Sequence, residues 1–141
     1  MIILDSDHLS VLRYRETHRA KQLFLRLDES KVKPLSTSIV NVEEAMRGWM
    51  ATLAKERQVD RQISAYRELA ELFAFFSGYS IVLWDVASSA LFHGFRKSGV
   101  RIGTRDLKTA CVAIVNGATL LTANRRDFEK VPSLKFENWL D

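Results

Sequence analysis

Cysteine and proline are nearly absent from this chain of 141 residues, which has one cysteine, two prolines and six glycines. Because there is only Cys111, an internal disulfide and a cysteine-based metal cluster are excluded. Small residues surround Cys111, and we predict a packed, structural cysteine in a reducing compartment. Linkers rich in proline or glycine are also absent, and so are internal repeats. We therefore predict a single domain that spans residues 1–141.

Long hydrophobic runs are missing as well. The most apolar stretch, LAELFAFF, is far shorter than the ~20 residues that a membrane-spanning helix needs. The first apolar run ends at Asp5, too early for the hydrophobic region of a signal peptide. We therefore expect a cytoplasmic protein that does not bind membranes. The 21 Lys and Arg residues exceed the 17 Asp and Glu residues, and the net charge of +4 favours a polyanionic partner without establishing one.

What the chain does contain is an alternation of short apolar strands and amphipathic helices. Strands are predicted at residues 2–4, 35–40, 81–84, 119–122 and, as a short fifth, 134–136. The helices between them include one capped by Asn41 that runs to about Arg57, and one capped by Thr104 that ends at Asn116. This alternation predicts an α/β fold, a three-layer α/β/α sandwich with a mostly parallel sheet of four to five strands.

Polar side chains follow these strands at the edge where ligands bind in parallel sheets. Asp5 ends the first strand, Glu44 lies in the first turn after the second, and Asn124 and Asp127 follow the fourth; Asp106 begins the helix before the fourth. Several carboxylates can share one pocket only when a cation offsets their repulsion. Oxygen ligands without a matching histidine and cysteine set favour Mg²⁺ or Mn²⁺ over zinc, and such ions assist phosphodiester hydrolysis.

Each acid also has a purely structural interpretation. Glu44 and Asp106 lie in the first turns of predicted helices, where a carboxylate stabilises the helix by itself. Asp127 can cap the turn around it, and for Asp7 we predict that it caps the first helix. Asp5 is the hardest to explain in this way, because no lysine or arginine adjoins it in the sequence.

Three segments resemble, in order and spacing, the PIN domain, specifically the VapC-like toxin ribonucleases of bacterial toxin–antitoxin pairs. They are LDSDHLS, SIVNVEEAMRG and IGTRDLKTACVAIVNGATLLTANRRDF. The resemblance covers residues 2–128, and the closing segment VPSLKFENW also looks like the last strand of the family. Each motif alone is loose, whereas their order and intervals together are specific.

Carried over position by position, the resemblance implies three acids of a metal site. Asp5 matches the first metal-binding aspartate, in a motif that usually reads Asp-Thr-Asn and here reads Asp-Ser-Asp. Asp106 matches the second metal-binding aspartate, and Glu44 the glutamate that helps to hold the metal or activate its water. Glu43 is the alternative, but the family's glutamate usually lies four residues before a glycine, and Gly48 therefore favours Glu44.

The fourth acidic position departs from the family, because Asn124 stands where an aspartate is common. Either Asn124, through its amide oxygen, or Asp127 completes the catalytic set, and the number of ions stays open. Basic residues near these acids are suited to hold RNA phosphates, although a solvated helix face is their alternative. We predict substrate binding by Ser6, Arg105, Arg125 and Arg126.

The resemblance implies a Mg²⁺-dependent endoribonuclease that acts as a toxin, forms a homodimer and is silenced by an antitoxin whose tail enters the active-site groove. One alternative is a non-catalytic RNA- or protein-binding module, for which Asn124 speaks. The other is a phosphatase of the haloacid dehalogenase type, in which Asp5 would attack phosphorus and Asp7 would act as the acid. That family requires a later lysine and an acidic loop, and the sequence offers neither.

Overall fold

A computed structural model describes residues 1–141 and contains a five-stranded sheet in the order β3-β2-β1-β4-β5. Every neighbouring pair of strands is parallel. The strands are β1 (Ile2–Leu4), β2 (Ser36–Ser38), β3 (Ser80–Val82), β4 (Thr119–Leu121) and β5 (Lys135–Glu137). In the register of the sheet, Leu4 lies beside Thr37 and Leu121, so the three central strands end at the same level.

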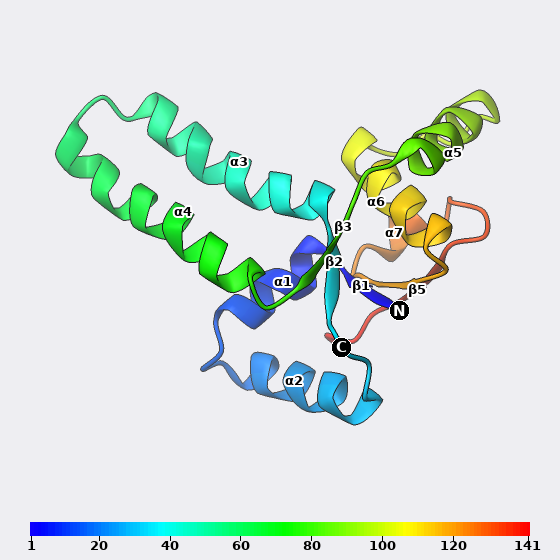
Figure 1. The fold of residues 1–141 in the computed structure, drawn as a ribbon, viewed down its shortest axis with the longest axis horizontal. Coiled ribbons are helices and arrows are strands. Elements are labelled where there is room, and N and C mark those ends of the chain that lie inside the picture. Colours follow the sequence, from blue (N-terminus) through cyan, green and yellow to red (C-terminus); the bar gives the residue numbers. More distant parts are fainter.

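Helices cover both faces of this sheet (Figure 1). One face carries α1 (Ser6–Arg13), α2 (His18–Ser30), α3 (Ile39–Lys55) and α4 (Ile63–Phe76). The other face carries α5 (Val86–Lys97), α6 (Thr104–Val115) and α7 (Arg125–Phe128). The prediction of a three-layer α/β/α sandwich around a parallel sheet is therefore confirmed.

The alternation of side chains along the strands builds the two halves of the core. In β1, Ile2 and Leu4 pack among the residues of α1 to α4, whereas Ile3 packs against α6. In β4, Leu120 faces α6 and Leu121 faces the opposite layer. Successive side chains of a strand point to opposite faces, which explains why β1 is apolar throughout and why Leu120 and Leu121 of β4 are both fully buried.

The helix starts differ from the predicted ones at two places. Ser38, not Asn41, caps α3, because β2 ends two residues earlier than the apolar pattern suggests and the Ser38 hydroxyl accepts from the Asn41 backbone N–H. Likewise, Thr104 is the first residue of α6 and follows Gly103, which offers no side-chain cap. Cys111 is fully buried in α6, as predicted.

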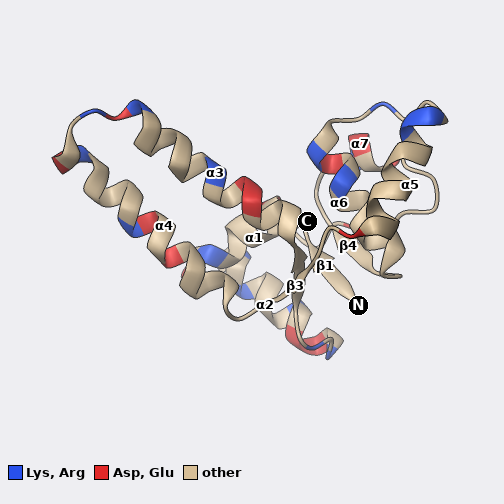
Figure 2. Ribbon diagram, turned by 45° about the horizontal axis from the view of Figure 1, so that its top comes forward, with Lys and Arg blue, Asp and Glu red and all other residues tan.

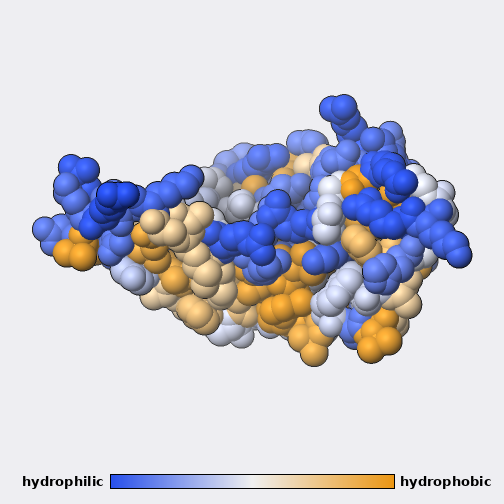
Figure 3. Space-filling model, turned by 90° about the horizontal axis from the view of Figure 1, so that it is seen from above, coloured by the Kyte–Doolittle hydropathy of each residue, from blue (hydrophilic) through white to orange (hydrophobic).

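The ends of α3 and α4 that lie far from the sheet extend beyond it as an arm, and the two helices are joined through a 3₁₀ turn (Val59–Gln62) and pack along each other (Figure 1). Seen from above, hydrophobic surface gathers in the middle of the molecule and along the arm, while mostly hydrophilic residues, with a small hydrophobic area among them, cover the tip of the arm (Figure 3). None of the helices combines the length with the apolar character that crossing a membrane requires.

Candidate active site

Asp5 is the buried centre of the site. It follows β1 directly, caps α1, and is only 7% exposed. Its Oδ1 accepts from the Ser6 backbone N–H and from Asn41 Nδ2, both at 2.9 Å, and its Oδ2 accepts from the Thr122 hydroxyl at 2.7 Å. Three polar groups from three segments thus fix both oxygens at the carboxyl edge of the sheet.

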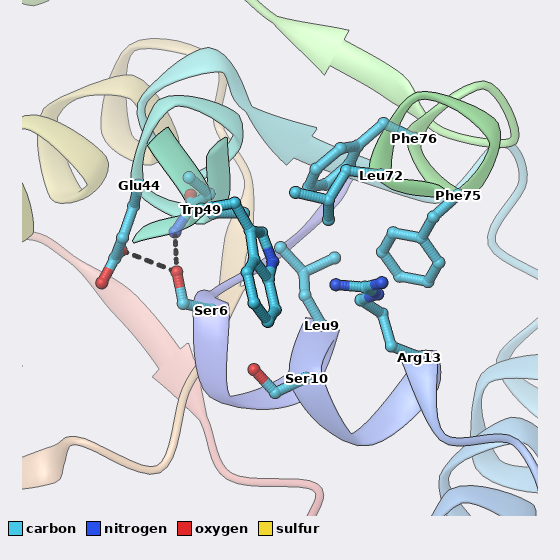
Figure 4. A pocket seen from close by; sticks show the side chains of 11 residues that line it. Ser6, Leu9, Ser10, Arg13, Glu44, Trp49, Leu72, Phe75 and Phe76 are labelled. Atoms are coloured by element: carbon cyan, nitrogen blue, oxygen red, sulfur yellow. Dashed lines mark hydrogen bonds between the residues drawn. The ribbon is translucent and has the colours of Figure 1, made fainter. Parts of the chain in front are cut away.

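A hydrogen-bonded chain joins Asp5 to Glu44 of α3. The Ser38 hydroxyl donates to Asn41 Oδ1 at 2.6 Å, so the NH₂ group of Asn41 is turned toward Asp5 and toward the Ser6 hydroxyl, 3.1 Å away. Ser6 in turn donates to Glu44 Oε2 at 2.7 Å (Figure 4). The structure brings Ser6 and Glu44 together, and the capping role that the sequence allowed for Glu44 is wrong because the carboxylate reaches Ser6 instead.

Asp7 lies on the other side of Asp5, where it ties α1 to the segment after β4. Its Oδ2 accepts from the Ala123 backbone N–H at 2.8 Å and from the Thr122 hydroxyl at 3.3 Å. Its Oδ1 lies 2.6 Å from His8 Nδ1. The prediction that Asp7 caps α1 is wrong, since Asp5, which directly follows the strand, takes the cap.

Asp106, Asn124 and Asp127 form the far wall of the site. Asn124 Nδ2 lies 3.1 Å from Asp127 Oδ2 and 3.5 Å from Asp106 Oδ2. Asn124 caps α7 through its Oδ1, which accepts from the Asp127 backbone N–H and fixes the orientation of the amide. Both candidates for the fourth position therefore lie beside Asp106, and Asn124 presents a donor to the two carboxylates.

Basic residues border these acids on α6 and α7 (Figure 2). Arg105 Nε lies 3.5 Å from Glu44 Oε2 and joins α6 to α3 across the site. Arg125 is 84% exposed and lies 3.8 Å from Glu129, and Arg126 is also exposed. Lys108 differs from the expectation of a solvated side chain, because its ammonium group lies over the Trp84 ring.

Burial and mutual repulsion alter the pKa values of the acids. Burial raises the pKa of Asp5 to about 6, although the Thr122 hydrogen bond acts in the opposite direction. Burial, followed by the charges of Asp127 and Glu44, also raises the pKa of Asp106. For Asp7, burial is outweighed by the hydrogen bonds from His8 and from the Ala123 backbone, which lower its pKa. The repulsion on Asp106 indicates that acids of α3, α6 and α7 act on one another, as around a cation-binding pocket.

The donor set fits a hard divalent cation with part of its water shell. No three Asp, Glu, His or Cys side chains come close enough to hold an ion by themselves. Mg²⁺, however, usually keeps several waters and takes only one or two carboxylates from a protein. Oxygen donors and repelling carboxylates are both present, and this is the chemistry that a partly hydrated Mg²⁺ ion would require of the site.

Two residues that hold Asp5 were not assigned to the site from the sequence. Asn41 was interpreted as a helix cap, and Thr122 as the end of a strand. In the structure both residues are buried. In the sequence, the only signal that could have identified them is that both are polar and follow a central strand. His8 is also fully buried; it links Asp7 to the Trp139 backbone N–H, 3.2 Å from His8 Nε2, and so has a structural position.

We expect the metal-free protein to lose stability as the pH rises from about 4 to about 6. Because the folded pKa of Asp5 lies above its unfolded value, the folded state retains a proton that the unfolded chain releases in this window. The shift from 3.8 to about 6 corresponds to about 3 kcal/mol. Urea unfolding in EDTA at several pH values should show this loss in the wild type and not in Asp5→Asn. Parallel pH profiles for the two proteins would contradict the burial of an uncompensated carboxylate.

Replacing Thr122 with valine, which keeps the shape of the side chain, should weaken Mg²⁺ binding by about 10- to 100-fold. The change removes the donor that orients Asp5 Oδ2 and leaves the strand intact. Isothermal titration with Mg²⁺ measures the effect. Thr119→Val, at the other end of β4, is the matched control and should bind Mg²⁺ as the wild type does; equal affinities for both variants would exclude the orienting role of Thr122.

Comparisons with known proteins give one local sequence match and several structural matches. No family model matches the chain. Ribonuclease VapC2 of Rickettsia felis is 44% identical over 43 residues, which are 30% of this chain and 32% of that protein. The matched segment thus spans about a third of this curated relative.

Solved structures match over nearly the whole length. A chain of VapBC-1 from nontypeable Haemophilus influenzae has a TM-score of 0.74 and 20% identity, with 100% of both chains covered. A chain of DNA-bound VapBC from Salmonella typhimurium has a TM-score of 0.73 and 20% identity, over 98% of this chain and 97% of that one. Together with the local sequence match, these structures confirm the resemblance, and the chain has the fold of the VapC-like PIN-domain proteins.

Proposed function

We propose that this protein is a Mg²⁺-dependent endoribonuclease that acts as the toxin of a toxin–antitoxin pair. The observation that carries the proposal is the buried carboxylate of Asp5, connected through hydrogen bonds to Glu44 on one side and to the Asp106–Asn124–Asp127 group on the other. A buried acid among other acids is costly unless a cation compensates it. The local match to a protein named a ribonuclease supports the same activity.

Asp5 and Asp106 are the residues that would bind the ion. The hydrogen bonds from Asn41 and Thr122 hold Asp5 in one orientation, which is how neighbouring groups usually tune a metal-binding side chain. When bound, Mg²⁺ supplies the positive charge that activates a water and offsets the charge that develops on the phosphate. Asn124 adds no charge, and the site with Asp127 as its fourth acid is better suited to one ion than to two.

Glu44 is placed to take the proton of the attacking water. Its Oε2 is engaged by Ser6 and Arg105, which leaves Oε1 for this task. Ser6 orients the Glu44 carboxylate through its hydroxyl, and Arg105 keeps a positive charge beside it. A positioned carboxylate with these partners is a suitable general base for hydrolysis.

The surrounding charges favour a nucleic-acid substrate, and the local match to a protein named a ribonuclease favours RNA. Arg105, Arg125 and Arg126 border the acids, and their guanidinium groups can bind the phosphates on either side of the scissile bond. Without such residues, an acidic pocket would repel a polyanion. The phosphate contacts fix the strand but do not by themselves select a sequence.

The two alternatives have less support. A haloacid dehalogenase-type phosphatase needs a later lysine and an acidic loop, and the sequence offers neither. It also needs Asp7 as an acid, whereas the contacts with His8 and Ala123 lower the pKa of Asp7. Only Asn124, which donates to Asp106 in place of a fourth acid, favours a non-catalytic module.

We also propose an antitoxin and a second copy of this chain as protein partners. The structural neighbours are VapBC complexes, in which the matched chain occurs together with a second component. Apolar residues exposed near the tip of the arm support a protein contact there: Val59 is 74%, Ile63 58% and Tyr66 57% exposed.

The direct test is incubation of the purified protein with a panel of structured and single-stranded RNAs and matched DNAs in Mg²⁺. We expect cleavage within the RNA chains and little cleavage of DNA. Equal cleavage of RNA and DNA would contradict the assignment of RNA as the substrate, and the absence of any cleavage would favour the non-catalytic module.

A further inference from the structure

A cavity of about 220 Å³ opens beside the acidic site, between α1, α3 and α4. Ser6, Asn41 and Glu44 belong to both the cavity and the site, so the two are continuous. The rest of the lining is mostly apolar and includes three aromatic side chains, Trp49, Phe75 and Phe76 (Figure 4). The cavity is smaller than the roughly 300–1,000 Å³ of pockets for drug-sized ligands, and its size therefore favours an occupant with one planar ring system, fused or simple.

The side chains that line the cavity are rigidly held. Leu9 and Leu72 are buried in the core, and Trp49 and Phe75 are half-buried. The guanidinium group of Arg13 lies at the Phe75 ring, 5.9 Å from its centroid, and donates to Glu68 at 3.0 Å (Figure 4). Because a guanidinium group has five N–H donors, Arg13 retains donors beyond the one that Glu68 takes.

We propose that this cavity binds an unpaired nucleobase of the RNA, from a nucleotide next to the scissile phosphate. The proposal rests on the proposed ribonuclease function and adds to it the origin of sequence preference. Aromatic faces and apolar side chains accept the plane of a base, as in other single-stranded RNA sites. Arg13 supplies donors for the edge of that base, and guanine, which offers two acceptors on one edge, suits them best.

The position of the cavity explains why a base is the favoured occupant. Glu44 lies at the boundary with the acidic site, so a phosphate held there by Arg105 leaves the attached nucleoside beside the cavity. An aliphatic side chain of a protein partner would use the apolar residues but leave the donors of Arg13 without acceptors. A planar ring with acceptors on its edge satisfies both.

The first test is the cleavage profile of a randomised RNA pool with wild type, Trp49→Ala and Phe75→Ala. We expect the wild type to prefer one base at a fixed position next to the cut, and each variant to lower that preference by about 5- to 100-fold. Phe73→Ala is the matched control, because Phe73 lies in the same helix, is 63% exposed and does not line the cavity. Trp49→Phe keeps an aromatic ring and should retain the preference.

A uniform wild-type profile would overturn the proposal without any variant. It would also be overturned if folded Trp49→Ala protein kept the wild-type cleavage profile. This holds even if the variant binds a protein partner more weakly, because the cavity would then serve that partner and not a base. Binding of the four homo-oligonucleotides to Asp106→Asn protein separates the two proposals. A base preference in binding without cleavage by the wild type would contradict the ribonuclease function alone; cleavage without any base preference would contradict the cavity alone.

Discussion

Asp5→Asn should reduce the rate of RNA cleavage by about 10²- to 10⁴-fold while the protein stays folded. The amide keeps the size of the side chain but carries no charge, so it cannot bind Mg²⁺ as the carboxylate does. Removing a buried, partly protonated acid also relieves a desolvation cost. We therefore expect the variant to keep its fold, and single-turnover cleavage with saturating RNA measures the loss of activity directly.

The control for this change is Asp85→Asn. Asp85 caps α5 by accepting from the Ser88 backbone N–H and hydroxyl, lies outside the candidate active site, and is exposed. Because asparagine is as good a helix cap as aspartate, this variant should cleave at the wild-type rate. If Asp5→Asn cleaves as fast as Asp85→Asn, Asp5 has no part in the chemistry and the proposed mechanism fails.

Induced expression of the protein should halt bacterial growth, and Asp106→Asn should remove that arrest. Asp106 lies in the first turn of α6, and the charges of Asp127 and Glu44 repel its carboxylate. If Asp106 is one of the two metal ligands, as proposed, its loss should lower the rate by a factor comparable to that of Asp5→Asn, which is enough to let cells grow. Growth curves at equal protein levels, checked by immunoblot, measure the difference.

Asp60→Asn is the matched variant for the growth experiment. Asp60 lies in the 3₁₀ turn at the tip of the arm, is exposed, and should leave the arrest unchanged. Equal growth arrest by wild type and Asp106→Asn would mean that toxicity arises elsewhere than in the acidic site. Arrest that depends on Asp106 but not on Asp60 would support a toxin that acts through RNA cleavage.

The layout of the acids could be predicted from the sequence because it depends on topology alone. Strands that alternate with helices form a parallel sheet, and acids that follow such strands meet at one edge. This reasoning placed Asp5, Glu44 and Asp106 at one edge, and the contacts of Ser6, Arg105 and Asn124 now connect them. Such an argument needs only the order of elements and the positions where the strands end.

The hydrogen bonds within the site could not be predicted in the same way. Asn41 was expected at a helix cap. However, β2 ends at Ser38, three residues before Asn41, so Asn41 lies inside α3 and its amide turns to Asp5. Thr122 comes 117 residues after Asp5, and no local pattern connects the two. The direction of the Asp7 side chain depends on His8 and Ala123, which only the folded chain brings to it.

The cavity beside the site was not predictable either. Trp49 and Phe75 have the spacing of ordinary core residues in α3 and α4, and only the angle at which the two helices meet α1 leaves space between them. In the same way, Arg13 looks like a last-turn residue of α1, whereas its ion pair with Glu68 of α4 places the guanidinium group in the cavity.

The dependence of cleavage on added metal tests the central claim most directly. The purified protein is treated with EDTA, dialysed, and assayed on a cleaved RNA from the panel with and without Mg²⁺. We expect no measurable cleavage in EDTA and full recovery when Mg²⁺ is restored, with recovery also in Mn²⁺. Cleavage at the full rate in EDTA would contradict a metal-dependent site built on Asp5, Glu44 and Asp106.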